Sequence, residues 1–299
     1  MNAEKINLDD YIQSGEGFNG ASYDSKSDPS IMVKLYSESY PLEPIYSELE
    51  VAKKVYSIGI PSPEPGSIVT DGKRIGIRFK RIVGKRSFSR MFADEPERVE
   101  AYARIYARNC KKLHSIECPE GMFPNAKEQF LHFLDTNQNF NASEKKVIYD
   151  FIKSVPDSKT ALHGDMHIGN IICTLPKGAP IDSKFDTYFI DLGYFSYGFP
   201  LFDLGMFQNV CYASSPEFVL NDMHITQEFA REVWKYFIDE YFFADDKLGE
   251  KYFGKGCTPE SVDKALQKYT AVKLLFVGFN MGGKLLDIHE EYVRKAFGI

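Results

Sequence analysis

The first 80 residues alternate between short apolar runs and turns rich in glycine, proline and aspartate. Residues 31–36 are almost wholly apolar and follow a polar turn at residues 24–30. Residues 67–70 and 74–81 flank an Asp-Gly pair, which is typical of a two-residue hairpin turn. Short runs of this kind, bounded by turn residues, predict strands. The N-terminal part therefore predicts a β-rich lobe.

One helical pattern interrupts these strands, between Pro44 and Ser57, where Gly59 and Pro61 end it. Its apolar residues recur at helical spacing and are expected to be buried: Ile45, Leu49, Ala52, Val55 and Tyr56. Glu48 falls inside that stripe, where an unpaired carboxylate would be costly. Lys34, on the preceding predicted strand, is its expected partner, and Glu50 is the alternative carboxylate.

Beyond Gly84 the apolar positions recur at the spacing of helices. Helices are expected at residues 96–115, 143–154, 227–243 and 259–279. Asp94 is expected to cap the first, and Asn141 with Glu144 has the spacing of a capping box for the second. We therefore predict an α+β fold of two lobes.

One short β-hairpin lies among the helices, with strands at residues 171–173 and 187–190. The predicted N-terminal lobe, residues 1–83, holds an antiparallel sheet and one helix. The predicted C-terminal lobe, residues 84–299, is helical and contains the hairpin.

The densest group of reactive side chains surrounds this hairpin. His163-Gly164-Asp165-Met166-His167-Ile168-Gly169-Asn170 precedes it, and Ile190-Asp191-Leu192-Gly193 stands at its far end. Antiparallel pairing would bring Asn170 and Asp191 together, and their oxygens are ligands that Mg²⁺ prefers. Asp165 could then orient an acceptor hydroxyl and take its proton. The arrangement indicates phosphoryl transfer from ATP.

The segment HGDMHIGN resembles the H-G-D-x-H-x-x-N signature of the aminoglycoside phosphotransferase and choline kinase-like superfamily. Residues 190–193 and 198–204 are similar to its I-D-x-G…G-x-P-x-x-D-L continuation. The resemblance covers most of residues 12–210, and the final ninety residues carry no motif of this family. It implies a two-lobed protein kinase-like fold and a phosphotransferase that uses ATP and Mg²⁺. In such a fold residues 1–83 would bind the nucleotide, and residues 84–299 would contain the acceptor site.

The resemblance also implies a role for each matching position. Asp165 is similar to the catalytic base, and Asn170 and Asp191 are similar to the Mg²⁺ ligands. Lys34 resembles the lysine that holds the α- and β-phosphates, and Glu48 resembles its partner on the helix. Asp203, near the start of a helix, resembles the residue that braces the catalytic loop.

The remaining nucleotide contacts implied by the resemblance lie in the first lobe and on the hairpin. The adenine slot would be lined by Met32, Ile172 and Ile190, and hinge backbone from Phe79 to Arg81 would read the adenine edge. Backbone N–H groups of a glycine-containing turn before Lys34 could cradle the phosphates. Its glycines are Gly15, Gly17 and Gly20, within the run Gly15-Glu16-Gly17-Phe18-Asn19-Gly20.

His163 and His167 allow two interpretations. In an extended segment both would point the same way as Asp165, as in the transition-metal site of a metal-dependent hydrolase. Alternatively, the two histidines hold the catalytic loop in shape by hydrogen bonds. His114, at the end of its predicted helix, is interpreted as a C-terminal cap.

The acceptor is expected to be a small molecule with a hydroxyl group rather than a protein. The stretch between Asp191 and Asp203 is much shorter than the activation segment on which protein kinases bind a peptide. Aminoglycosides, choline-like amines and amino sugars are the classes that the resemblance implies. An acidic, aromatic region could bind an amine through cation–π contacts, or could be a packed helix. It comprises Trp234, Tyr236, Phe237, Asp239, Glu240, Tyr241, Asp245 and Asp246.

The alternative to an enzyme is a pseudokinase that binds a nucleotide and acts as a scaffold. The intact set of Lys34, Asp165, Asn170 and Asp191 argues against it.

The composition is ordinary for a globular protein, with 43% hydrophobic and 26% charged residues. The formal net charge of -6 gives no reason to expect nucleic acid as a partner. No apolar run approaches the length of a membrane span, and the N-terminus lacks the apolar core of a signal peptide. Five cysteines without a C-x-x-C pair indicate reduced thiols, so a cytoplasmic protein is expected.

Overall fold

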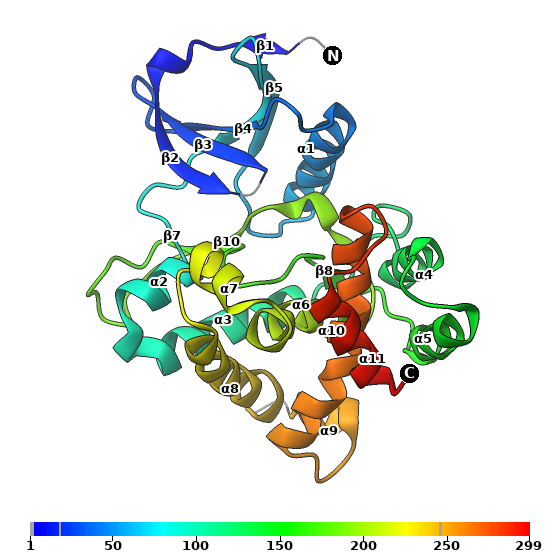
Figure 1. Cartoon of the computed structure of the whole chain (residues 1–299). Coiled ribbons are helices and arrows are strands. Elements are labelled where there is room, and N and C mark those ends of the chain that lie inside the picture. The colour runs from blue at the N-terminus through cyan, green and yellow to red at the C-terminus, as the bar shows by residue number, and fades with distance from the viewer. Residues whose placement is uncertain (1–2, 18, 245–246) are drawn as a thin grey trace. The chain divides into compact units, whose positions relative to one another are not determined.

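The computed structural model describes residues 3–17, 19–244 and 247–299. Its elements form two compact units (Figure 1). The first unit comprises the chain up to Ser87 together with Asn170–Tyr194, and the second comprises Phe88–Gly169 and Phe195–Ile299. The first is rich in strands and the second is mainly helical, so the chain is α+β, as predicted.

The first unit is built on a six-stranded sheet with the order β1-β5-β6-β4-β3-β2. A 3-10 turn, η1 (Leu8–Asp10), separates its first two strands. The strands are β1 (Glu4–Lys5), β2 (Tyr11–Gly17), β3 (Gly20–Ser25), β4 (Ile31–Tyr36), β5 (Pro65–Thr70) and β6 (Ile75–Lys80). Neighbouring strands are antiparallel, as predicted, except for β1 and β5, which are parallel. Ile6 explains the exception, because it is buried against Val69 and its N–H donates to the Thr70 carbonyl at 2.8 Å.

Helix α1 (Leu42–Ser57) packs on this sheet through the predicted apolar stripe. Ile45 and Leu49 lie in one buried cluster with Tyr36, Ile68 and Ile77 of the strands. Tyr56 was expected in the same stripe, but its side chain in the last turn of the helix is 43% exposed. The buried face therefore ends one residue earlier, at Val55.

The hairpin of β9 (Ile171–Cys173) and β10 (Thr187–Phe189) is antiparallel, with Ile171 opposite Phe189. It belongs to the first unit, which differs from the predicted division at residue 83. Two interactions explain the difference. Strand β7 (Arg86–Ser87) pairs with β9, and the Phe189 N–H donates to the Pro61 carbonyl at 2.8 Å. The 3-10 turn η3 (Leu192–Tyr194) then packs against α1.

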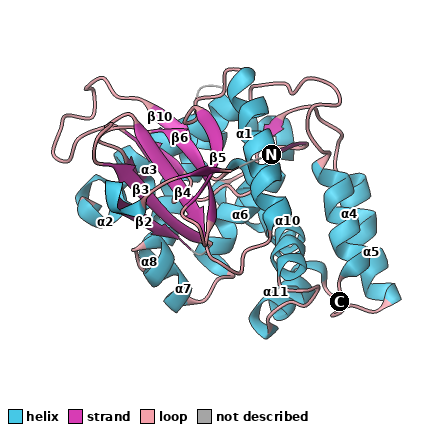
Figure 2. Ribbon diagram, turned by 90° about the horizontal axis from the view of Figure 1, so that it is seen from above, coloured by secondary structure: helices cyan, strands magenta, loops and turns pink. Residues whose placement is uncertain are grey.

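The second unit consists largely of helices, shown in cyan in Figure 2. Helix α6 has most of its residues buried and contacts both α8 and α10, so it forms the centre of this unit. The helices are α2 (Phe88–Asp94), α3 (Val99–Leu113), α4 (Ala126–Thr136), α5 (Ala142–Ser154), α6 (Leu201–Tyr212), α7 (Pro216–Met223), α8 (Gln227–Phe243), α9 (Leu248–Phe253), α10 (Pro259–Asn280) and α11 (Asp287–Phe297). Three short elements complete it: η2 (Pro96–Arg98), β8 (Ala161–Leu162) and β11 (Ser196–Tyr197), which pairs with β8.

Helix boundaries agree well with the sequence pattern, with one correction. The predicted capping box is present, because Asn141 accepts from the N–H of Glu144 and Glu144 accepts from the N–H of Asn141. Asp94, by contrast, is not at the cap position of the element that follows. It is the last residue of α2, and the chain enters α3 through the 3-10 turn η2, whose cap position is Glu95.

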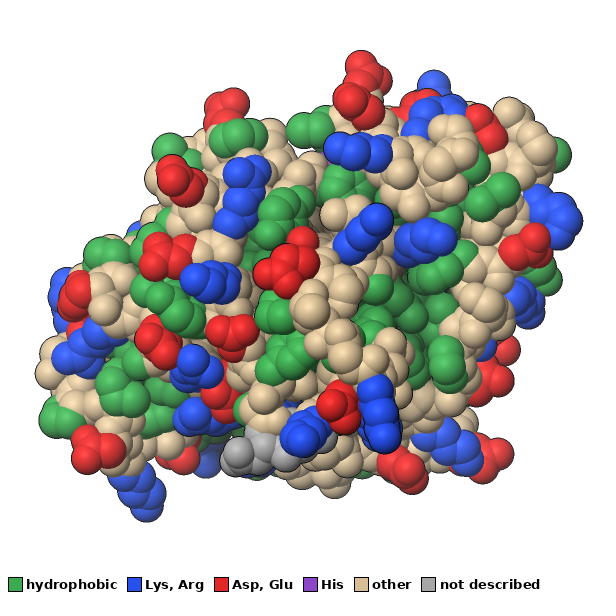
Figure 3. Space-filling view, turned by 90° about the horizontal axis from the view of Figure 1, so that it is seen from below, with side chains coloured by type: hydrophobic (Ala, Val, Ile, Leu, Met, Phe, Trp, Pro, Cys, Tyr) green, Lys and Arg blue, Asp and Glu red, His purple; other side chains and the backbone are tan. Residues whose placement is uncertain are grey.

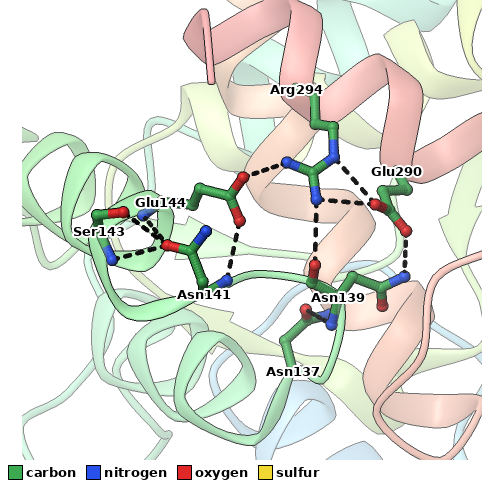
Figure 4. A network of polar contacts seen from close by, with 7 residues as sticks. All are labelled: Asn137, Asn139, Asn141, Ser143, Glu144, Glu290 and Arg294. Carbon is green, nitrogen blue, oxygen red and sulfur yellow. Dashed lines mark hydrogen bonds and ion pairs between the residues drawn. The ribbon is translucent and has the colours of Figure 1, made fainter.

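The capping box continues into a polar network that fixes the C-terminal helix (Figure 4). Arg294 of α11 forms ion pairs with Glu144 of α5 and with Glu290 of its own helix. Its guanidinium also donates to the Asn139 carbonyl at 3.2 Å, while the Asn139 amide donates to Glu290 at 2.5 Å. Helix α11 is therefore bound to α5 and to the loop before it.

Charge and cysteine placement fit the composition. On the face shown in Figure 3 acidic and basic side chains are interspersed. All five cysteines are free, and only Cys257 is not fully buried. Among the described residues no helix is long and apolar enough to cross a membrane.

Candidate functional site

Lys34 lies in the middle of β4 and pairs with two carboxylates. Its neighbours Val33 and Leu35 are fully buried on the other face of the strand, so Lys34 points away from that core. Its Nζ is 2.9 Å from Glu48 Oε1 and also forms an ion pair with Asp191 Oδ1. The predicted Lys34–Glu48 pair is thus confirmed. The alternative, Glu50, instead pairs with Lys53 on the surface at 3.0 Å.

The electrostatics of this cluster favour a charged lysine. Burial lowers the pKa of Lys34, but the negative charges of Asp191 and Glu48 outweigh it and hold the pKa well above its ordinary value. The Tyr36 ring centroid, 5.0 Å from Nζ, adds a cation–π contact. A fixed cation between two carboxylates can bind phosphate oxygens when one carboxylate turns to another partner.

Asn170 and Asp191 stand at the two open ends of the hairpin strands. The Ile190 N–H donates to the Asn170 carbonyl at 3.0 Å, which extends the ladder by one position and places the two segments side by side. Asp191 has φ 56°, a conformation that few residues other than glycine adopt, and it directs the carboxylate to Lys34. One amide and one carboxylate oxygen fit a hard cation such as Mg²⁺. Asn170 and Asp191 belong to the same unit as Lys34 and Glu48.

The glycine-containing turn joins β2 to β3. Gly17 pairs with Gly20 across the turn, and Phe18 between them lies outside the described residues. A Cβ on Gly20 would stand 2.1 Å from the Leu35 carbonyl, so glycine is needed there for strand packing. A Cβ on Gly15 or Gly17 would meet nothing closer than 3.7 Å, and both residues are exposed. Both glycines lie in β2, the edge strand of the sheet, and are paired with Ser22 and Gly20 of β3.

The three residues predicted to line an adenine slot all belong to the first unit. Met32 and Ile172 are buried, and Ile190 is half-buried. The Met32 sulfur lies 3.8 Å from Lys85 Nζ.

Two backbone amides of the predicted hinge, Phe79 to Arg81, are hydrogen-bonded within the first unit. The Lys80 N–H donates to the Glu64 carbonyl at 2.9 Å, and the Arg81 N–H donates to the Ser30 carbonyl at 2.7 Å. The sheet pairing thus continues through Arg81, and neither donor is left to read an adenine edge.

In the second unit, Asp203 holds the loop that carries Asp165. Its side chain lies in the first turn of α6 and is 2% exposed. It accepts the N–H of His163 at 2.6 Å and the N–H of Gly164 at 2.9 Å. Asp203 therefore braces this loop, as the sequence motif implied.

The two histidines of the motif also hold the loop. The Asp165 N–H donates to His163 Nδ1 at 3.3 Å, and the Gly169 N–H donates to His167 Nδ1 at 3.0 Å. His167 Nε2 lies 3.7 Å from Asp165 Oδ2. Within the described ranges, no group of three or more histidine, cysteine or acidic side chains is arranged to hold a metal ion. Both histidines accept hydrogen bonds from amides of the loop, as the hydrogen-bonding interpretation expects.

His114 has a function that sequence reasoning missed. It follows α3 at the cap position, as predicted, but its ring is buried and bonds to other elements. Nε2 is 3.1 Å from Asp203 Oδ2, and Nδ1 is 2.7 Å from the Tyr241 hydroxyl. A carboxylate can only accept, so Nε2 carries the proton. His114 thus orients the residue that orients the loop.

The carboxyl group of Asp203 makes the stability of the fold depend on pH in the acidic range. Burial raises the pKa of Asp203, but the hydrogen bond and charge of His114, with the charge of His163 and the Gly164 N–H, lower it below its ordinary value of 3.8. A depressed pKa stabilises the fold above the unfolded-state value, and this contribution is lost as the pH falls through the folded-state value.

We therefore expect Asp203→Asn to lower the free energy of unfolding by roughly 3–5 kcal/mol at neutral pH, because it replaces one buried acceptor oxygen with an NH₂ group that cannot accept from the donors facing it. Denaturant unfolding of both proteins from pH 7 to pH 2 measures this. The difference between them should shrink below about pH 4. A constant difference across that range would contradict the role given to the carboxylate charge.

The acidic, aromatic region near the C-terminus is a packed helix rather than an open amine site. Trp234, Phe237 and Tyr241 of α8 are buried and stack on one another, with centroids 5.4 and 5.5 Å apart. Glu240 is neutralised by Arg108 at 2.7 Å and Arg104 at 3.2 Å. Asp245 and Asp246, also predicted to contribute, lie outside the described residues.

Comparison with solved structures bears on the fold. The gentamicin–APH(2")-IIa complex is 18% identical, with 96% of this chain and 89% of that chain covered and a TM-score of 0.51. The GDP and kanamycin complex of APH(2")-IIia is 13% identical, covers 98% and 92%, and has a TM-score of 0.52. Aminoglycoside phosphotransferase APH(3'')-Id from Streptomyces rimosus is 18% identical, covers 87% and 92%, and has a TM-score of 0.50.

At such low sequence identity the similarity concerns the fold alone. It confirms the predicted two-lobed, protein kinase-like architecture. No curated protein matches the chain. A family model described as the phosphotransferase enzyme family, APH, matches residues 15–237, which is well over half of the sequence. That match includes the Lys34 cluster, the Asp165 loop and the hairpin, and the chain therefore belongs to the phosphotransferase enzyme family.

Proposed function

We propose that this protein transfers the γ-phosphate of ATP to a hydroxyl group of a small molecule, with Mg²⁺ as cofactor. The observation that carries the proposal is the pairing of Lys34 with both Glu48 and Asp191. A lysine on a central strand, held by a helix carboxylate and facing a second carboxylate at a hairpin end, is suited to a nucleotide's phosphates.

The first unit supplies the donor half of the reaction. Lys34 would hold the α- and β-phosphates, and Glu48 would keep its side chain in place. Gly15 and Gly17 would let the backbone approach the phosphates. Asn170 and Asp191 offer the oxygens that would hold Mg²⁺, which when bound neutralises charge on the phosphate oxygens.

The second unit supplies the acceptor half. Asp165 would accept a hydrogen bond from the acceptor hydroxyl, orient its oxygen towards the phosphate, and take the proton as the new P–O bond forms. The bond between the γ-phosphorus and the β–γ bridging oxygen would break in the same step, and ADP would leave. Its backbone is held by His163 and, through Gly164, by Asp203. Such pre-organisation is what makes a positioned base effective.

Aminoglycosides are the first acceptor class to test, because gentamicin and kanamycin are named in complexes with proteins of the same fold. Choline-like amines and amino sugars follow. The donor is ATP in this proposal, and GTP is the comparison, since one of those complexes contains GDP. The short stretch between Asp191 and Asp203 supports a small acceptor over a peptide.

The test is a screen that measures nucleotide consumption and detects a phosphorylated product by mass spectrometry. ATP and GTP are each combined with aminoglycosides, amines, sugars and alcohols, with and without Mg²⁺. Product formation that requires nucleotide, Mg²⁺ and Asp165 supports the proposal. Nucleotide binding without transfer to any acceptor would favour a pseudokinase scaffold, and turnover of substrates without nucleotide would favour a hydrolase.

A further inference from the structure

Lys273 is a basic residue within a continuous buried stretch of α10. It lies in α10 in the run Ala271-Val272-Lys273-Leu274-Leu275-Phe276, and it is 3% exposed. Burying an ammonium group is costly unless partners compensate it. A lysine flanked by apolar residues within a helical pattern indicates a buried ammonium group.

The partner of Lys273 is the loop that carries Asp165. Its Nζ donates to the Gly164 carbonyl oxygen and stands 3.8 Å from the ring centroid of Phe276. The ammonium group is thus directed from the centre of α10 to the backbone next to Asp165. The aromatic face of Phe276 stabilises the charge from another side.

The Gly164 carbonyl belongs to the peptide bond that leads into Asp165. The N–H of the same peptide is that of Asp165, and it donates to His163 Nδ1. The preceding peptide is held by Asp203 through the Gly164 N–H. Gly164 has φ 80°, so the chain turns sharply here. Lys273 holds the carbonyl side of the Asp165 peptide, which neither His163 nor Asp203 is seen to hold.

We propose that Lys273 is a positioning residue for phosphoryl transfer, which fixes the peptide before Asp165 and places a positive charge beside that carboxylate. The inference rests on the proposed function of Asp165 as the base. Lys273 itself is buried and reaches the reaction only through the loop.

The charges around Lys273 agree with this assignment. Burial lowers the pKa of Lys273, while the negative charges of Asp165 from the loop and Asp203 from α6 offset part of that effect. Asp203 also faces His114 and His163, so its charge is shared among several partners. Asp165 is the other carboxylate on which the lysine acts.

Lys273→Met tests the proposal, because methionine keeps the length of the side chain and removes its charge and donor. We expect kcat to fall about 10²-fold, the effect of a small displacement of a catalytic group, with KM for the nucleotide within about twofold of wild type. Lys264→Met, at an exposed position of the same helix, is the matched control and should behave as wild type.

A double mutant separates positioning from general structural damage. If Lys273 acts through Asp165, then Lys273→Met should reduce activity little further in an Asp165→Asn background. An equal loss in both backgrounds, or a wild-type kcat in Lys273→Met alone, would overturn the proposal.

Hydrogen exchange of the Gly164 and Asp165 amides gives a readout that needs no activity. Exchange should become faster in Lys273→Met and stay slow in Lys273→Arg, which keeps a charged donor. If the wild-type protein transfers phosphate to no acceptor, the proposed function fails while this measurement still decides whether Lys273 fixes the loop. Should Lys273→Met not fold, Lys273→Arg decides: slow exchange supports the proposal, and fast exchange in a folded protein refutes it.

Discussion

Asp165→Ala is expected to reduce kcat for phosphoryl transfer by roughly 10²–10⁴-fold, the range for loss of a positioned general base. The nucleotide contacts proposed for Lys34, Asn170 and Asp191 lie in the other unit of the chain and stay intact. The affinity for nucleotide should therefore remain within about threefold of wild type, an expected difference well under 1 kcal/mol in binding free energy. Titration of a fluorescent nucleotide analogue and steady-state kinetics with one acceptor measure the two quantities.

The neighbouring variant Asp165→Asn sharpens this result. Asparagine keeps the size of the side chain and can still bond to the acceptor hydroxyl, but it cannot take a proton at neutral pH. A loss in Asp165→Asn close to that in Asp165→Ala would assign the effect to proton transfer. Full activity in either variant would remove Asp165 from the mechanism.

Asp191→Ala is expected to weaken both binding and turnover. Its carboxylate is a proposed ligand of Mg²⁺ and one of the two partners of Lys34. The variant therefore loses a metal ligand and leaves Lys34 with Glu48 as its remaining carboxylate partner among the two. We expect kcat/KM for the nucleotide to fall roughly 10²–10³-fold, as when one pre-organised group that stabilises charge is removed. Unlike Asp165→Ala, this variant should also bind nucleotide less tightly and need more Mg²⁺ for half-maximal rate.

Glu50→Ala is the control for this experiment. Glu50 lies two positions after Glu48 on α1, but it pairs with Lys53 at an exposed site. Surface pairs of this kind contribute little, so its kinetics should match those of wild type. If Asp191→Ala retained wild-type affinity for nucleotide and Mg²⁺, the assignment of the metal site to the hairpin ends would be wrong.

The parts of the fold that sequence could predict are those fixed by local periodicity. Glu48 lies at the spacing of a buried helix face, and that alone required a cation from the adjacent strand, which is Lys34. The capping box at Asn141 and Glu144 depends on residues three positions apart. The hairpin ends followed from two short apolar strands, whose pairing leaves little choice of register.

The parts that could not be predicted depend on residues far apart in sequence. Strand β1 has two residues, both charged and exposed, so no apolar pattern predicts the strand or its parallel pairing with β5. The bond between His114 and Asp203 joins the end of α3 to the start of α6, and neither local pattern implies the other. The carbonyl acceptors of the Lys80 and Arg81 amides lie in other segments, so no local pattern predicts that these two amides are already hydrogen-bonded.

The first unit is built from two segments that are separate in the sequence. Lys34 and Glu48 come from before residue 87, whereas Asn170 and Asp191 come from a separate stretch of the chain, Asn170–Tyr194. A gene fragment that stops at Ser87 would thus encode the lysine and its partner without either hairpin oxygen. The first unit cannot be expressed as one continuous piece without the stretch Phe88–Gly169 of the second unit, and recombination between relatives would have to move both of its segments together.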